Sequence, residues 1–419
     1  MAYGQYIGTC GTSSPLSPRT GGAAGASSLE IVPSLCLSER YDTNVFYRPP
    51  TPGLDRADFV TTVNPVLLLR YRGDYASGVL NMGGFAETYA RNSDLNYLGT
   101  RDTLSLNLDN SIRRVIPNAS LRIDEYLTYT PLPPGFISPT AGTSPNDPGN
   151  LQNVYAQGFM ASRTDTLINN ATVSTSYATT ASTSLNASYS YAIIRFGSGA
   201  STQGLTLFNT TTQTAGVGGS AGLSEVDTLN VRYTYTQTEF TPNASSSSNI
   251  STTFIANSAT MGWSRIHTPY LRTELGGGGI LINPGIATYA ANAALVMNSL
   301  SNSATISYAR SALPNFSSVG GTGGGILIGD VFSLSAVQRI DRQWQLAESV
   351  SYAHTSGSGG IDPVTYDSFA AGGDIQYWVT SVWATSLSYS YSKFINEVGS
   401  ANTDFDRQVI MLSVRATWE

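Results

Sequence analysis

Apolar and polar residues alternate along most of this chain, and this alternation constrains the fold more than any other feature of the sequence. Near the C-terminus the even positions are apolar, namely Ile410, Leu412, Val414, Ala416 and Trp418, whereas the odd positions include Arg407, Ser413, Arg415 and Thr417. Because successive side chains of a strand point to opposite faces, this segment is predicted to be a strand with one apolar and one polar face. A long series of such strands is typical of a transmembrane β-barrel.

The same patterning predicts about 18 strands. We expect them near residues 29–37, 59–71, 76–91, 101–112, 119–130, 164–177, 181–195, 211–223, 227–240, 252–264, 270–282, 287–298, 302–311, 325–338, 343–355, 365–377, 381–394 and 405–418. An even number is what bacterial single-chain barrels require, so 16 strands is the alternative. The predicted fold class is therefore all-β, a transmembrane antiparallel up-and-down barrel.

The connectors between these strands give independent support. Every second connector is tight, as at Arg72–Tyr75 and Ala178–Thr180, whereas the others are mostly long, as at Ser38–Asp58; Asn283–Ile286 is the exception. Short periplasmic turns and long outer loops produce this alternation in outer-membrane barrels. A β-propeller or β-helix would instead repeat at a fixed period.

Composition excludes several other classes of protein. Of the 419 residues, 41% are hydrophobic and only 12% are charged, with a net charge of -6. Soluble domains carry roughly 25% charged residues, and disordered chains are normally rich in charge and poor in aromatic residues. The longest aliphatic run, Val66–Leu69, is far too short for a membrane-spanning helix. Because the chain has no basic cluster, nucleic-acid binding is not expected.

No linker divides the chain, so we predict one barrel at residues 29–419, preceded by a flexible periplasmic segment at 1–28. That segment lacks a secretory signal, which an outer-membrane protein needs, so we expect that the start is trimmed or mis-called. It is also too short and too rich in Gly and Ser to fold into a plug. Cys10 and Cys36 do not have a metal-ligand spacing, and Cys10 is expected to be a bystander thiol rather than a lipoprotein cleavage site.

Nothing in the sequence favours catalysis. The glycine runs Gly276–Gly279 and Gly320–Gly325 lack the Gly-Lys-Ser/Thr of a phosphate-binding loop, and glycines relieve curvature in barrel strands. The two histidines, His267 and His354, have no evident Ser or Cys partner. We therefore expect no enzymatic activity, no cofactor and no metal.

Charged residues on the polar faces of the strands are candidate pore-lining residues. By strand parity this set comprises Arg70, Glu87, Asp109, Arg122, Asp124, Arg232, Arg272, Glu274, Asp374, Arg407 and Arg415. They could brace the wall as ladders of arginines and carboxylates, or they could line a pore and bias its ion preference. The two roles are compatible.

The longest connector, Pro131–Arg163, is a candidate constriction loop. Loops longer than roughly 12–15 residues are usually functional or disordered, and prolines in its first half disfavour a helix or strand there. Apolar surface from Phe136, Tyr155 and Phe159, with Asp147 beside it, favours packing of the loop on the barrel wall. We expect the loop to narrow the pore mouth; a mobile surface loop is the alternative.

One stretch resembles a known group of proteins. The element Tyr41-Asp42-Thr43-Asn44-Val45-Phe46-Tyr47 is followed by Asp58-Phe59-Val60 and then by Asn64-Pro65. Over about residues 32–69 this resembles the outer-membrane β-barrel porins found with bacterial exopolysaccharide and protein-sorting gene clusters. Outer-membrane proteins usually end on an aromatic residue, whereas here Trp418 is penultimate. The resemblance implies an outer-membrane barrel serving polysaccharide traffic, and it supplies no catalytic or ligand residues.

The sequence thus predicts a water-filled channel in the outer membrane of a Gram-negative bacterium, for passive solute passage or polysaccharide export. The alternative is a non-conducting barrel, either an adhesin or a sheath around an electron-transfer partner. Expected partners are outer-membrane lipid, lipopolysaccharide and the barrel-assembly machinery, with a polysaccharide or a small hydrophilic solute as cargo.

Overall fold

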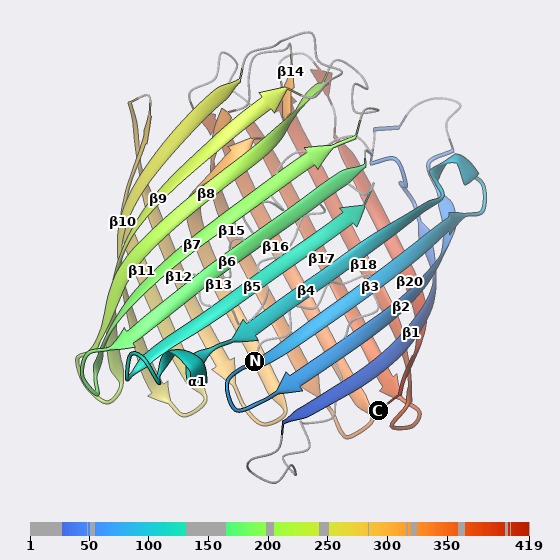
Figure 1. Cartoon of the computed structure of the whole chain (residues 1–419). Coiled ribbons are helices and arrows are strands. Elements are labelled where there is room, and N and C mark those ends of the chain that lie inside the picture. The colour runs from blue at the N-terminus through green and yellow to red at the C-terminus, as the bar shows by residue number, and fades with distance from the viewer. Residues whose placement is uncertain are drawn as a thin grey trace.

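Eighteen long antiparallel strands form the closed wall of a barrel in the computed structural model (Figure 1). The structure describes residues 27–47, 49–50, 55–130, 165–197, 205–242, 251–283, 285–315, 317–319, 325–358, 365–398, 401–402 and 404–418. The first strand, β1, pairs with β2 on one side and with the last strand, β20, on the other, which closes the wall. The predicted fold class is confirmed, with 18 strands rather than 16.

The strand bounds agree with the predicted ranges to within a few residues at most ends. The first nine wall strands are β1 (Ser28–Asp42), β2 (Asp58–Arg72), β3 (Ser77–Tyr89), β4 (Tyr97–Asn107), β5 (Ala119–Thr130), β6 (Thr166–Ala178), β7 (Thr183–Phe196), β8 (Leu205–Gly222) and β9 (Asp227–Pro242). The other nine are β10 (Thr252–Thr268), β11 (Leu271–Asn283), β12 (Ile286–Asn298), β13 (Asn302–Asn315), β15 (Gly325–Arg339), β16 (Trp344–Ser358), β17 (Thr365–Trp378), β18 (Trp383–Val398) and β20 (Phe405–Thr417). Smaller elements are η1 (Ser93–Leu95), α1 (Asp109–Ile112), β14 (Ser317–Val319) and β19 (Ala401–Asn402).

The two ends of the barrel differ as the connectors predict. Tight turns gather at the lower end in Figure 1, here called the turn end, and the opposite end is the loop end. Short polar side chains close the turns: the Ser224 hydroxyl, for example, accepts hydrogen bonds from the backbone amides of Val226 and Asp227. The predicted exception also holds, since β11 and β12 are joined tightly at the loop end, where Gly285 adopts a φ of 77° that favours glycine.

The two faces of the wall have opposite character. On β16, Trp344 and Tyr352 are both 41% exposed on the outer face, whereas Ser351 and Thr355 point into the barrel and are buried. The two aromatic residues lie eight positions apart, which is about 20 Å along the axis of a barrel with tilted strands. This spacing is close to the height of the apolar band of a transmembrane barrel. Among the described residues, no helix is long and apolar enough to cross a membrane.

Cys36 forms a disulfide that the sequence does not predict. Its side chain is 3% exposed on the inner face of β1 and is disulfide-bonded. Disulfides form and persist in oxidising compartments such as the bacterial periplasm. Cys10, the other cysteine of the sequence, lies outside the described residues, as does nearly all of the predicted N-terminal segment 1–28.

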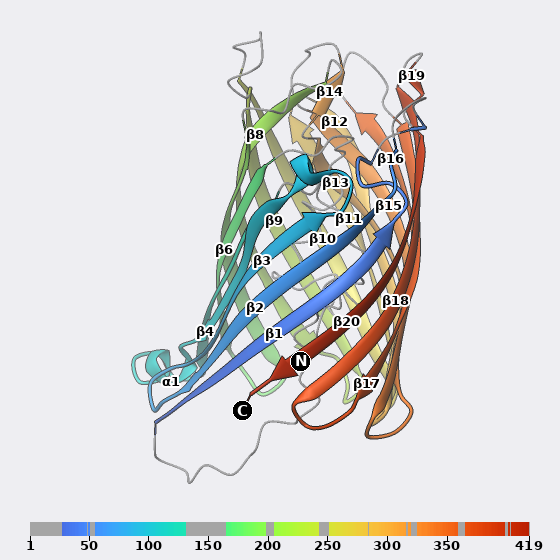
Figure 2. The same cartoon turned by 90° about the vertical axis from the view of Figure 1, so that its right-hand side faces the viewer.

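One part of the loop end departs from a plain barrel. Strand β14, which follows β13, pairs with β8 rather than with a neighbour of β13 (Figure 2). Along the wall, β8 and β13 are five strand positions apart, which is roughly 24 Å at the usual strand spacing. The loop end of β13 and β14 therefore reach across the mouth of the barrel toward β8.

Candidate functional site: the barrel lumen

The lumen-facing side chains of the wall form the candidate site. All but one of the predicted pore-lining residues occupy inward-facing strand positions: Arg70, Glu87, Arg122, Asp124, Arg232, Arg272, Glu274, Asp374, Arg407 and Arg415. On β9, for instance, Arg232 shares the face of the buried Thr238 and Phe240, whereas Val231 and Tyr233 are 54% and 46% exposed on the outside. The parity of each strand therefore identifies the lumen face correctly.

Asp109 is the exception, and its predicted place on a strand is wrong. It is the first residue of α1, in the connector between β4 and β5 at the turn end. Its carboxylate accepts hydrogen bonds from the Leu121 backbone amide at 3.0 Å and from the Asn107 side-chain amide at 3.2 Å. Asp109 thus holds a turn together and lies off the strands that form the pore wall.

Most of the described lumen arginines contact a carboxylate. Arg272 and Glu274 share one face of β11 and approach to 2.8 Å, and Arg122 and Asp124 do the same on β5. Residues two apart on a strand point the same way, so each pair forms without distortion of the backbone. Arg232 donates instead to the Ser188 hydroxyl at 2.9 Å. These contacts have the geometry that bracing of the wall requires.

A buried charge cluster joins the first and last strands at the loop end. Arg40 on β1 contacts both carboxylate oxygens of Glu87 on β3 at 2.7 Å, and the Tyr89 hydroxyl donates to Glu87 at 2.9 Å. Asp42 on β1 accepts from two nitrogens of Arg407 on β20, the shorter contact being 2.6 Å. The side chains of Arg40, Glu87 and Asp42 are at most 8% exposed. We call these five residues the seam cluster; its two cations and two anions balance.

The segment after β1 completes this cluster. The Asn44 side-chain amide donates to the Asp406 carbonyl on β20 at 3.1 Å, and its backbone amide donates to Asp42. The Tyr47 ring lies over the Arg407 guanidinium, 4.7 Å from the ring centroid. Burial raises the pKa of the Tyr47 phenol, whereas the charge of Arg407 acts in the opposite direction. The motif that resembles the exopolysaccharide-associated porins is therefore the part of the chain that ties β1 to β20.

Sequence reasoning missed Arg40 and Asp42. The predicted first strand ends at residue 37, but β1 continues to Asp42, and both residues have the inward parity of Cys36. Extending the alternation by five residues would have placed both side chains in the lumen.

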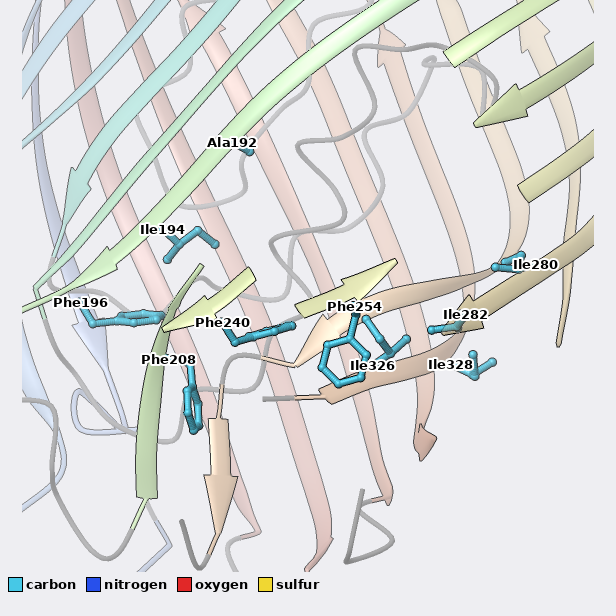
Figure 3. Close-up of a cluster of buried hydrophobic side chains, with 10 residues drawn as sticks. All are labelled: Ala192, Ile194, Phe196, Phe208, Phe240, Phe254, Ile280, Ile282, Ile326 and Ile328. Atoms are coloured by element: carbon cyan, nitrogen blue, oxygen red, sulfur yellow. The ribbon is translucent and has the colours of Figure 1, made fainter. Parts of the chain in front are cut away.

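The opposite side of the lumen carries an apolar cluster at the loop end (Figure 3). Its members are buried side chains at the loop ends of the neighbouring strands β7–β11 and of the more distant β15: Ala192, Ile194, Phe196, Phe208, Phe240, Phe254, Ile280, Ile282, Ile326 and Ile328. Phe208 and Phe240 are fully buried. An inner wall facing only water would not bury such residues, so this part of the lumen is packed.

Two further predictions concern the constriction loop and metal binding. The candidate constriction residues Phe136, Asp147, Tyr155 and Phe159 lie outside the described residues. Within the part of the chain that the structure describes, no group of three or more His, Cys, Asp or Glu side chains could hold a metal ion.

Comparisons with known proteins give structural likeness only. No family model matches the chain, and no curated protein matches it. The outer membrane protein OpdK from Pseudomonas aeruginosa is 11% identical with a TM-score of 0.45, over 93% of this chain and 99% of that one. OccK3 (OpdO) from the same species is 14% identical with a TM-score of 0.41, over 93% and 96% of the two chains. The ferric-catecholate import receptor Fiu from E. coli K12 is 9% identical with a TM-score of 0.43, over 92% and 81%.

Proposed function

We propose that this protein is an outer-membrane channel through which hydrophilic solutes pass passively. The observation that carries the proposal is the two-sided wall: exposed Leu, Val, Tyr and Trp side chains cover the outside, whereas arginines, carboxylates, Ser and Thr cover much of the inside. Such a wall suits lipid on one side and water on the other. A barrel of about this size leaves an aqueous channel unless something fills it.

The disulfide at Cys36 supports the same location, because it needs an oxidising compartment such as the periplasm. Lipid and lipopolysaccharide would then surround the barrel, and the barrel-assembly machinery would insert it. Polysaccharide export is the narrower form of the proposal and rests on the sequence resemblance over about residues 32–69. The alternative remains a non-conducting barrel that acts as an adhesin or as a sheath around a partner.

Conductance in planar bilayers tests the proposal. The purified, folded protein is added to one side of the bilayer, with the same protein after heat unfolding as the control. Discrete conductance steps from the folded sample alone are expected. A folded barrel that never conducts, and that copurifies with a partner, would instead favour the structural alternative. Swelling of vesicles in sugars of increasing size would then separate a small-solute channel from a polysaccharide exporter.

A further inference from the structure

The loop-end part of the β13–β15 hairpin separates from β12 and folds into the mouth, while β15 stays paired with β16. We call residues 311–315 of β13, β14, and residues 325–329 of β15 the crossing hairpin. We propose that the crossing hairpin is the constriction of the channel and sets the size of the solutes that pass. This inference rests on the proposed function and is separate from the predicted constriction at Pro131–Arg163.

The hydrogen-bond ladders show where the hairpin separates from β12 and that β15 remains paired with β16 as far as Ile326. Pairing between β12 and β13 ends at Ala291 and Arg310, although β12 continues toward the loop end to Ile286 and β13 continues to Asn315. Pairing between β13 and β15 persists to the end of β13, so the hairpin itself stays intact. The two strands therefore separate from β12 as one unit.

Burial shows that the hairpin turns inward. Ile326 and Ile328 have the parity of Phe332 and Leu334, which are 51% and 45% exposed on the outer face of β15. Yet Ile326 and Ile328 are only 6% and 7% exposed, and they belong to the same packed cluster as inward-facing residues such as Ile282. Ile326 and Ile328 lie on the face of β15 that is turned outward lower in the wall. They can contact side chains of the inner wall only if the hairpin lies inside the barrel, with this face against the inner face of β8–β11. Figure 3 shows Ile326 beside Phe254.

The sequence of β15 agrees with burial of both faces of the strand at its loop end. Ile326, Leu327 and Ile328 form a continuous apolar run, and Leu327, on the other face of the strand, is 1% exposed. Strands covered on both faces read as continuous apolar runs, whereas strands of a single-layer wall alternate. Nearer the turn end, β15 returns to alternation, since Val331 and Ser333 are buried while Phe332 and Leu334 are exposed.

A group of polar side chains clamps the root of the hairpin. Arg310 on β13 forms an ion pair with Asp330 on β15, and the Tyr308 hydroxyl donates to Asp330 at 2.7 Å. The Arg310 guanidinium also lies 4.3 Å from the ring centroid of Tyr289 on β12. The clamp sits where β13 parts from β12, and it fixes the point from which the hairpin crosses.

The geometry makes the hairpin a substantial obstruction. An 18-stranded barrel with strands tilted by about 40° is about 35 Å across between backbones. Two paired strands with their side chains occupy roughly 10 Å of that width. Because β14 pairs with β8, the hairpin is held at its tip as well as at its root and along its apolar face. Solutes must pass through the part of the mouth that it leaves free.

An engineered disulfide tests where the hairpin lies, independently of conductance. Ser318 on β14 and Thr206 on β8 are paired across the antiparallel ladder, so their Cα atoms should be about 4.5–5.5 Å apart, within the range that a disulfide can bridge. In a background of Cys10→Ser and Cys36→Ser, the variant Ser318→Cys/Thr206→Cys should crosslink. The control Ser318→Cys/Thr228→Cys, with its second cysteine at the turn end of β9, should not. Absence of the first crosslink from a folded barrel would overturn the proposal.

Conductance then tests what the hairpin does. Ile326→Asp/Ile328→Asp should undock the hairpin and raise the single-channel conductance severalfold, and Ile328→Thr should act in the same direction but less. Ala294→Asp/Val296→Asp, which adds the same charges to the lumen face of β12 near the turn end, should leave the conductance near the wild-type value. Gel migration before and after boiling confirms that each variant is folded.

The outcomes separate the two proposals. If the disulfide forms but the wild type and every folded variant are silent, the proposed channel function fails while the hairpin still crosses the mouth. If the wild type conducts and the folded undocking variants conduct equally, the hairpin is not the constriction and the inference is wrong.

Discussion

Replacing Glu87 with Gln should destabilise the barrel strongly, because it removes one partner of a buried ion pair. Arg40 and Glu87 are joined by two contacts of 2.7 Å, and their side chains are 8% and 5% exposed. Breaking such a pair by removing one partner costs about 3–5 kcal/mol, since the remaining charge stays buried without compensation. Among the described residues a second carboxylate, Asp42, lies 3.8 Å from Arg40, but it already binds Arg407. It cannot replace both lost contacts.

An exposed ion pair at the same end of the barrel provides the matched control. Arg91 and Asp55 approach to 2.6 Å, but their side chains are 57% and 61% exposed, and exposed pairs contribute only about 0–1 kcal/mol. Asp55→Asn should therefore be nearly neutral. The double variant Arg40→Met/Glu87→Leu should recover much of the loss, because replacing both partners of a buried pair with apolar residues is often neutral.

The measurement is equilibrium unfolding of each variant by urea in lipid vesicles, followed by tryptophan fluorescence and by migration on gels without boiling. Glu87→Gln should unfold at a much lower urea concentration than Asp55→Asn. Equal midpoints for these two variants would show that the seam cluster contributes no more than a surface pair, and the reasoning from burial would be refuted.

Three further predictions concern the lumen, the cysteines and the long loop. Arg232→Ser should fold normally and shift the reversal potential toward cation preference. Val231→Arg on the outer face should instead lower the folding stability by roughly 2–4 kcal/mol if it lies near the bilayer midplane. If Arg232→Ser fails to assemble while Val231→Arg assembles normally, the assignment of the two faces is inverted. Because the sequence has only two cysteines, peptide mapping without reduction should recover a peptide that joins Cys10 and Cys36; two free thiols in the folded protein would contradict this. Deleting residues 136–155 should raise the conductance and preserve assembly, and an unchanged conductance would place that loop outside the pore.

The sequence alone was sufficient for the wall of the barrel. Strand parity has a period of two, and a slip of one residue would turn every side chain of a strand to the wrong face. In a long strand with one apolar face, such as β9 or β20, the alternation therefore predicts which residues face lipid and which face the lumen. The inward placement of Arg232 and Arg407 could be predicted for this reason. Asp109 could not, because a short helical turn replaces the end of a strand there and parity has no meaning in it.

The tertiary structure decided which lumen residues meet. Arg40, Glu87 and Arg407 are far apart in the sequence and come together only because β1 pairs with β2 and β20 at once. The Asp58 carboxylate, at the start of β2, likewise accepts hydrogen bonds from residues distant in the sequence, the backbone amides of Arg91 and Asn92, which follow β3. Residue type and parity limit the candidates for such contacts, but closure of the barrel selects the partners.

The inward position of the crossing hairpin could not be predicted from the alternation of apolar and polar residues. Ile326 and Ile328 have the same parity as the lipid-facing Phe332, so alternation alone places all three on the outside. The apolar run at Ile326-Leu327-Ile328 indicates burial on both faces but does not identify the surface that covers them. That surface is the inner face of β8–β11, which exists only once the barrel has closed. The sequence therefore determined the single-layer wall, because each strand carries its own periodicity, whereas the double layer at the mouth was decided by contacts between strands that are far apart in the chain.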